Sequence, residues 1–188
     1  MSTTRIPDRR VQRTRAALMS AFIELVLTRG YEALTAGDIS RKANVGRSTF
    51  YLHYASKAAL LAESLRNVSN QLAACVDGNL TPQQLVPLLE HFREQRTVNR
   101  TFFADPIRSL WVKSLAALME SRLAARTGGS RSDLPRSLVA LMLAEMQIAL
   151  VTHWLTSKPA LKSELVATVL LANTDAMLSA FGRFDRTK

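Results

Sequence analysis

Apolar residues recur every three or four positions along most of the chain, which is the spacing of amphipathic α-helices. In the N-terminal third, this spacing predicts a helix over residues 8–29, which Gly30 ends. Two short helices, residues 36–43 and 47–53, follow. The turn between them, Asn44-Val45-Gly46, contains two residues that tolerate left-handed backbone.

The same apolar spacing predicts further helices from residue 57 towards the C-terminus. Capping and breaking residues mark their ends: Thr81-Pro82-Gln83-Gln84 is a start signal, and Gly182 is a stop. The predicted helices cover residues 57–76, 82–96, 99–103, 105–127, 135–157 and 161–181, with a loop at 128–130 and a break at Pro159. We expect a head at 1–56, a connecting helix at 57–76 and a second domain at 77–188.

Composition supports this reading. Leu (28) and Ala (25), both strong helix formers, are abundant among the 188 residues, whereas Gly (7) and Pro (6) are few. No stretch sustains the alternation of a half-buried strand. The sequence therefore predicts an all-α protein of about nine helices.

The two short helices have the form of a helix-turn-helix inside a basic unit. Such a motif needs a second helix that is anchored on one side and polar on the other, so that it can enter the major groove of DNA. The expected anchors are Ile39, Ala43, Val45 and Phe50. The side chains left to face outward are Arg47, Ser48, Thr49, Tyr51 and His53.

The charge is uneven. The net charge is +10, of which +6 falls in residues 1–66, where 11 side chains are basic and 5 acidic. A domain this basic usually meets a polyanion: nucleic acid, an acidic partner or an anionic membrane surface. The longest apolar run, residues 138–144, is too short to span a bilayer, and the polar, Arg-rich N-terminus is unlike a secretory signal. With a single cysteine, Cys75, we expect a cytoplasmic protein without disulfides, metal or cofactor.

Residues 35–57, TAGDISRKANVGRSTFYLHYASK, with Leu60 behind them, closely resemble the signature of the TetR family of transcriptional regulators. The resemblance covers about residues 8–66; beyond them it is one of architecture. Three positions depart from the family pattern: Asn44 replaces a glycine, Gly46 replaces a capping serine, and Ala59 replaces an acidic residue.

The resemblance implies roles for the head residues. Thr35, Tyr51 and Lys57 match positions that grip phosphates. Arg47, Ser48 and Thr49 match positions that reach base edges, and His53 either faces DNA or serves as a packing residue. The leading arginines form either an arm along the DNA or a solvated tail; these are Arg5, Arg9, Arg10 and Arg13.

The last two predicted helices are apolar nearly all round, so the second face of each needs a partner. The resemblance implies the same arrangement, in which these helices form a four-helix dimer interface. The expected interface residues are Leu141, Ile148, Leu155, Leu165, Val169, Ala172, Ala176 and Ala180.

The middle helices carry aromatic and methionine side chains that suit either a plain core or an adaptable ligand pocket. The resemblance favours a pocket for an unknown, largely apolar small molecule. The candidate lining residues are Leu88, Phe92, Phe102, Phe103, Trp111, Leu115, Met119, Met146 and Gln147.

Together these features predict a homodimeric regulator that binds a pseudo-palindromic double-stranded operator, most simply a repressor released by a small effector. One alternative is a DNA-bound interaction protein with a protein partner and no effector. An enzyme is the third choice, because the sequence has no glycine-rich phosphate loop and its three histidines are far apart.

Overall fold

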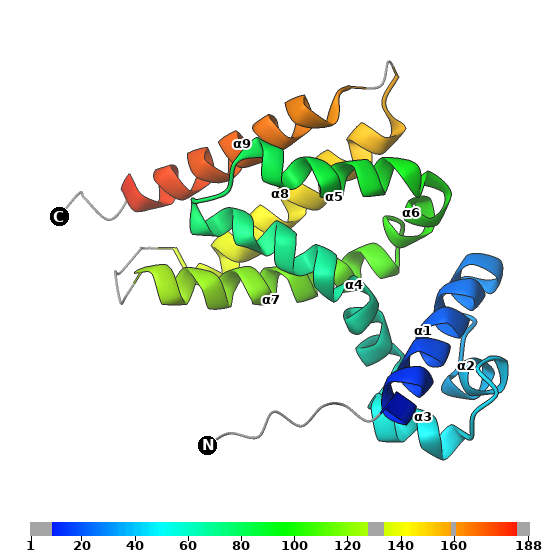
Figure 1. The fold of residues 1–188 in the computed structure, drawn as a ribbon. Coiled ribbons are helices and arrows are strands. Elements are labelled where there is room, and N and C mark those ends of the chain that lie inside the picture. Colours follow the sequence, from blue (N-terminus) through cyan, green and yellow to red (C-terminus); the bar gives the residue numbers. More distant parts are fainter. Residues whose placement is uncertain (1–8, 128–133, 159–160, 184–188) are drawn as a thin grey trace. The chain divides into compact units, whose positions relative to one another are not determined.

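The computed structural model describes residues 9–127, 134–158 and 161–183. Within these residues the chain forms nine α-helices and one 3-10 turn (Figure 1). In chain order they are α1 (Arg9–Arg29), α2 (Ala36–Lys42), α3 (Arg47–His53), α4 (Lys57–Ala73), η1 (Ala74–Asp77), α5 (Pro82–Glu94), α6 (Arg96–Phe102), α7 (Ile107–Thr127), α8 (Arg136–Thr156) and α9 (Ser163–Arg183). The all-helical prediction is confirmed.

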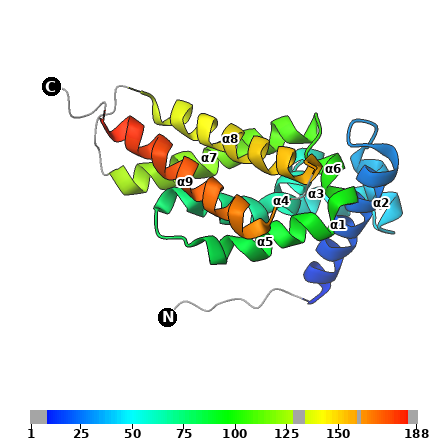
Figure 2. The ribbon, with the colours of Figure 1, turned by 90° about the horizontal axis from the view of Figure 1, so that it is seen from above.

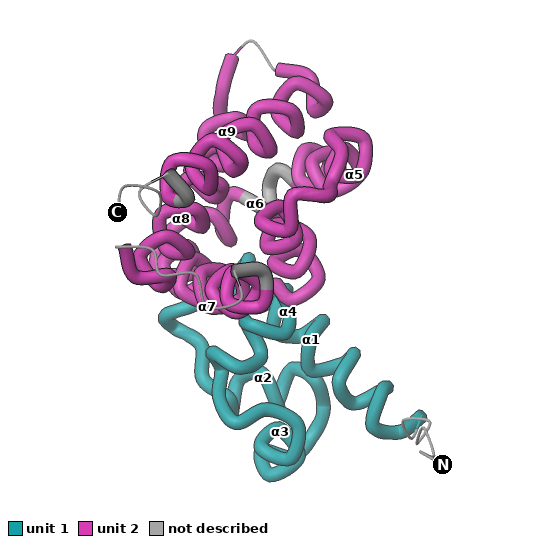
Figure 3. Tube along the Cα trace, turned by 90° about the vertical axis from the view of Figure 1, so that its left-hand side faces the viewer, with its two compact units in different colours: residues 1–64 teal, residues 65–188 magenta. Residues whose placement is uncertain are grey.

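The chain divides into two compact units, residues 1–64 and 65–188 (Figure 3). Unit 1 contains α1, α2, α3 and the first turns of α4, and its core holds Leu18, Phe22, Ile39, Phe50 and Leu60. The boundary falls inside α4, the helix expected to connect the domains. The division into a head at 1–56, a connecting helix at 57–76 and a second domain at 77–188 stays a prediction.

Unit 2 is a helical bundle. In it α7 packs on α8, α5 packs on α9, and α8 lies beside α9 (Figure 2). By length and composition alone, α8 and α9 could each cross a membrane. Each of them buries one face in unit 2. The two helices also leave a second apolar face uncovered, which is described below.

Several helix ends differ from the predictions. The helix expected over 57–76 stops at Ala73 and tightens into η1, which ends at Gly78 in left-handed backbone (φ 73°). The helix expected to run to residue 96 ends at Glu94. The last helix continues through Gly182 to Arg183, because glycine weakens a helix without excluding helical backbone. The predicted loop at 128–130 and the break at Pro159 lie outside the described residues.

Candidate nucleic-acid interface

Two seven-residue helices, α2 and α3, and the turn between them form the candidate site in unit 1. Thr35 caps α2 in a reciprocal capping box with Asp38: Thr35 Oγ1 accepts from the Asp38 backbone N–H at 3.1 Å, and Asp38 Oδ2 accepts from the Thr35 backbone N–H at 3.1 Å. Asn44 has φ 53°, the left-handed backbone expected of it. Gly46 begins α3 without a side-chain cap, as its departure from the family pattern predicted. The predicted helix-turn-helix is therefore confirmed as local structure.

The anchors hold α3 from one side. Ile39 and Phe50 are fully buried, and Ala43 and Val45 are half-buried. The Phe50 ring meets Tyr54 at a centroid distance of 6.0 Å, which ties the end of α3 to the same core. The helix is thus fixed by its apolar side.

The opposite side of α3 carries the predicted contact residues. Arg47 and Ser48 are exposed, Tyr51 is 49% exposed, and Thr49 and His53 are half-buried. The Arg47 guanidinium lies 5.9 Å from the centre of the Tyr51 ring, so the two side chains flank one edge of the helix. These groups offer a cation and several hydrogen-bonding atoms to a polyanion.

Thr35, predicted to grip a phosphate, already has a partner. Its hydroxyl donates to Asp38 Oδ2 at 2.6 Å. This bond, with the one from the Thr35 backbone, holds the pKa of Asp38 below its usual value. Thr35 is exposed and caps α2, and its phosphate contact stays a prediction.

Lys57 has a structural role that the sequence did not indicate. Its Nζ donates to the carbonyl oxygens of Tyr31 (2.7 Å) and Leu34 (2.9 Å) and lies 4.2 Å from the centre of the Tyr31 ring. A cation at the start of a helix is unfavourable for the helix dipole. The hydrogen bonds to these carbonyls offset that cost even when no phosphate is bound. Lys57 thereby ties the segment between α1 and α2 to α4 within unit 1.

Replacing Lys57 by methionine is expected to lower the free energy of unfolding by about 2 kcal/mol, because two charge-assisted hydrogen bonds to carbonyls are lost. Chemical denaturation of the full-length protein measures this. The matched control is Lys42→Met, whose ammonium pairs with Glu24 at the surface and whose loss should cost roughly 0–1 kcal/mol. Equal stability of the Lys57 variant and the wild type would contradict the structural role.

The prediction that the leading arginines form an arm or a solvated tail is corrected in part. Arg9, Arg10 and Arg13 lie in the first turns of α1 rather than in an extended arm. Arg5 lies outside the described residues. The start of α1 at Arg9 agrees with the helix predicted over residues 8–29, which already contained these three arginines.

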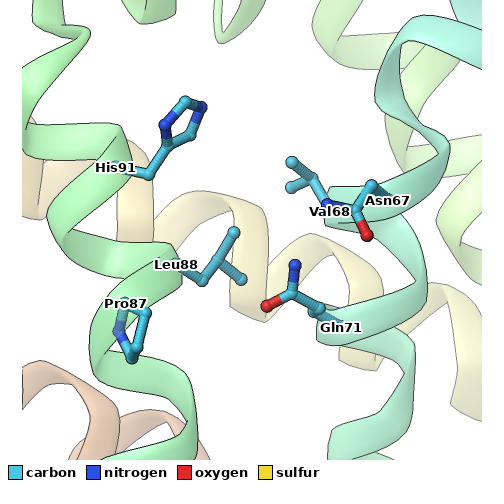
Figure 4. A pocket seen from close by; sticks show the side chains of 6 residues that line it. All are labelled: Asn67, Val68, Gln71, Pro87, Leu88 and His91. Carbon is cyan, nitrogen blue, oxygen red and sulfur yellow. The ribbon is translucent and has the colours of Figure 1, made fainter.

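A groove of about 230 Å³ opens between α4 and α5 in unit 2 (Figure 4). Its walls carry three polar side chains, Asn67, Gln71 and His91, and three apolar ones, Val68, Pro87 and Leu88. Pro87 stands inside α5 and has no N–H to donate to the carbonyl of the preceding turn. Of the nine predicted pocket residues, Leu88 is the one that lines this groove, so its lining is more polar than the prediction.

The other predicted pocket residues form core. The rings of Phe92, Phe103 and Trp111 meet at centroid distances of 4.8 to 6.3 Å, and Trp111 donates to Ser69 Oγ at 2.9 Å. Apolar side chains at helical spacing fill a core as readily as they line a cavity, so the role of these residues in a ligand pocket stays a prediction. Four other predicted pocket residues are also buried: Phe102, Leu115, Met119 and Gln147. Met146 is half-buried.

Gln147 sits in a buried polar cluster between α8 and α9. Its Nε2 donates to Thr174 Oγ1 at 3.4 Å, whereas its Oε1 has no hydrogen-bond partner among the described residues. Cys75 is also buried, and burial raises the pKa of its thiol to about 12. The thiol therefore stays protonated at neutral pH, and the cluster belongs to the packing of unit 2.

Apolar side chains remain exposed along α8 and α9. This surface, called the outer face below, comprises Leu138, Leu141, Met142, Leu165, Val169, Ala172, Ala176 and Ala180. It contains six of the eight predicted interface residues. Leu155 is half-buried, and Ile148 is fully buried in unit 2. Ile148 is a correction: α8 is apolar nearly all round, so its sequence does not tell the inner face from the outer one.

One exposed residue of α3 was missed. Leu52 is 82% exposed, although it is large and apolar. The signal was available in the spacing, because a residue two positions after the buried Phe50 points away from the core in a helix.

An anchored helix with a basic, polar outer side, joined to a second helix by a tight turn, defines a helix-turn-helix DNA-binding protein. Comparison with known proteins supports this class. Residues 18–64 match the family model described as bacterial regulatory proteins, tetR family. The helix-turn-helix unit of this chain is thus similar to that of the TetR family of transcriptional regulators.

Related sequences and solved structures that match this chain are also transcriptional regulators. Over 55 residues, 29% of this chain, the sequence is 51% identical to YxbF, an uncharacterized HTH-type transcriptional regulator of Bacillus subtilis. The match spans 14% of that protein, and a match to a second B. subtilis regulator, YdeS, spans 37% of its length. Over 89% of this chain and 96% of the other, the fold is similar to a TetR transcriptional regulator of Streptococcus agalactiae (29% identity, TM-score 0.58). A TetR-family regulator of Streptomyces coelicolor shares the fold over 93% of this chain and 98% of its own, with 19% identity and a TM-score of 0.66.

Proposed function

We propose that the protein is a homodimer that binds a specific, pseudo-palindromic DNA operator and represses transcription. The observation that carries this proposal is α3, which is anchored by Phe50 and presents Arg47, Ser48 and Tyr51 outward. The excess positive charge of residues 1–66 supplies the attraction to phosphates. A twofold dimer would place two such helices on half-sites about one helical turn, or a little more, apart.

Selection from a pool of random double-stranded DNA tests this function. The full-length protein should enrich an inverted repeat, because two identical heads read two half-sites of opposite direction. A pool that shows no enrichment after repeated rounds would contradict sequence-specific binding.

Arg47→Ala is expected to weaken binding to the selected duplex by about 1–3 kcal/mol, because an arginine can form two hydrogen bonds with a guanine edge. Binding to an unrelated duplex should change much less. Fluorescence anisotropy on both duplexes at one salt concentration measures the difference. Equal losses on both duplexes would assign Arg47 to phosphate contact instead of base reading.

Release by a small molecule is a further part of the proposal. The groove between α4 and α5 offers two amides and an imidazole, so its ligand would carry hydrogen-bonding groups as well as apolar surface. Such a ligand would release DNA only to the extent that it binds the DNA-free state more tightly.

A specific observation favours the alternative, a regulator with a protein partner and no effector. The aromatic residues expected to line a cavity pack against one another instead. A screen of small molecules for a rise in the unfolding temperature, followed by operator binding, separates the two. A ligand that stabilises the protein, loses this effect in Gln71→Leu and lowers operator affinity would support the effector. A stabilising ligand that leaves operator affinity unchanged would contradict it.

A further inference from the structure

Leu52 has the largest exposed fraction among the large apolar side chains that the structure describes as exposed. It is 82% exposed, whereas the next, Leu165, is 51% exposed and lies on the outer face. Single exposed leucines are common on protein surfaces. Leu52 differs in its position, because it stands on the helix proposed to enter the major groove.

The geometry of α3 places Leu52 at the centre of its outward side. With about 100° between successive residues, Ser48 and Leu52 lie about 20° on either side of the direction opposite Phe50. Arg47 and Tyr51 share one flank, where the structure brings them together. The residues farthest from the core are therefore a hydroxyl and an isobutyl group, with the cation to one side.

Charge complementarity identifies the occupant of this surface. Ser48 and Arg47 are exposed on the same helix as Leu52, and residues 1–66 carry a net charge of +6, which suits DNA. Within the major groove, bases present hydrogen-bonding atoms and one apolar group, the C5-methyl of thymine. An isobutyl group pressed on a polar base edge would displace water without forming hydrogen bonds, whereas against this methyl it buries apolar surface.

We propose that Leu52 is a specificity-determining residue that contacts the C5-methyl group of a thymine in each half-site. The inference rests on the proposed DNA-binding function and adds one recognised base, a thymine, to each half-site. Arg47 would read its base through hydrogen bonds, while Leu52 would read the presence of a methyl group.

Uracil substitution tests this contact, because deoxyuridine differs from thymidine only by the missing C5-methyl. The probe is the duplex that the wild-type protein selects from a random pool, in which each thymine is replaced in turn by uracil. At one thymine of each half-site, the substitution should weaken wild-type binding about fourfold, the factor expected for one buried methyl-sized group. In Leu52→Ala the same substitution should change the affinity by a factor near one.

Two variants serve as controls. Leu52→Met keeps a long apolar side chain and should retain the preference for thymine over uracil. Leu27→Ala removes the same atoms from an exposed leucine on α1, outside α3, and should also retain it. Because Leu52 is exposed, its replacement should leave the circular dichroism spectrum and unfolding temperature unchanged.

The outcomes separate this inference from the proposed function. If the wild-type protein selects a specific duplex but tolerates uracil at every thymine, the methyl contact is wrong and the DNA-binding function stands. If Leu52→Ala keeps the full preference for thymine, another side chain reads the methyl and the inference is overturned. If no duplex is selected, the proposed function fails, and the inference fails with it.

Discussion

Replacing Val169 by aspartate is expected to convert the protein from dimers to monomers. Val169 is exposed in the first half of α9, within the outer face and among Leu165, Ala172 and Ala176. If a second copy covers this face, the new carboxylate would be buried without a partner, which costs several kcal/mol. Since α9 meets the rest of its own unit through other residues, including Val166 and Leu170, the fold of the protomer should persist.

Light scattering after size exclusion measures this change. The wild type should have twice the chain mass of 20.8 kDa, and the Val169→Asp variant should have the chain mass itself. Operator affinity should fall by a factor on the order of 10² to 10⁴, because a monomer engages one half-site at a time. Ala117→Asp is the matched control, since it adds the same charge at an exposed position of α7 and should remain dimeric. A dimeric Val169 variant would show that the interface lies elsewhere.

Replacing Phe50 by alanine is expected to unfold the helix-turn-helix while unit 2 stays folded. Phe50 is fully buried, and its ring meets Tyr51 edge to face at 5.4 Å and Tyr54 at 6.0 Å. Removing such a side chain costs about 3–5 kcal/mol. A small unit has a total stability of only about 5–15 kcal/mol, so this loss is a large part of it.

Amide hydrogen exchange of the full-length protein locates the effect. Protection should fall in α2 and α3 of the Phe50→Ala variant and persist in α7 and α8, whose buried residues are in the other unit. Tyr51→Ala provides the comparison, because Tyr51 is half exposed: protection should stay near the wild type while affinity for DNA falls. A loss of protection throughout both units would contradict their independence.

The local signals of the helix-turn-helix were sufficient to predict it. The range 47–53 agrees with α3 at both ends, and α2 ends one residue earlier than predicted. A capping box, a left-handed Asn44 and an apolar anchor each act within a few residues, so the sequence displays them directly. The same applies to the start of α5, where Gln84 Oε1 accepts from the Thr81 backbone N–H at 2.8 Å.

Contacts between distant residues were harder to predict. Lys57 takes carbonyl partners more than 20 positions away, and nothing in its own neighbourhood indicates them. The groove between α4 and α5 depends on how two helices pack, which hydrophobic spacing alone does not determine. Ile148 and Leu141 are both apolar residues of α8, yet one is buried and the other is exposed.

We infer that a pair of heads, each built on α3, reads a DNA sequence. The most direct test of this inference compares the affinity of the full-length protein for the selected inverted repeat and for a shuffled duplex of equal length and composition, at one physiological salt concentration. Binding to the inverted repeat should be tighter than binding to the shuffled duplex by a factor on the order of 10³ or more. Equal affinity for the two duplexes would contradict the inference.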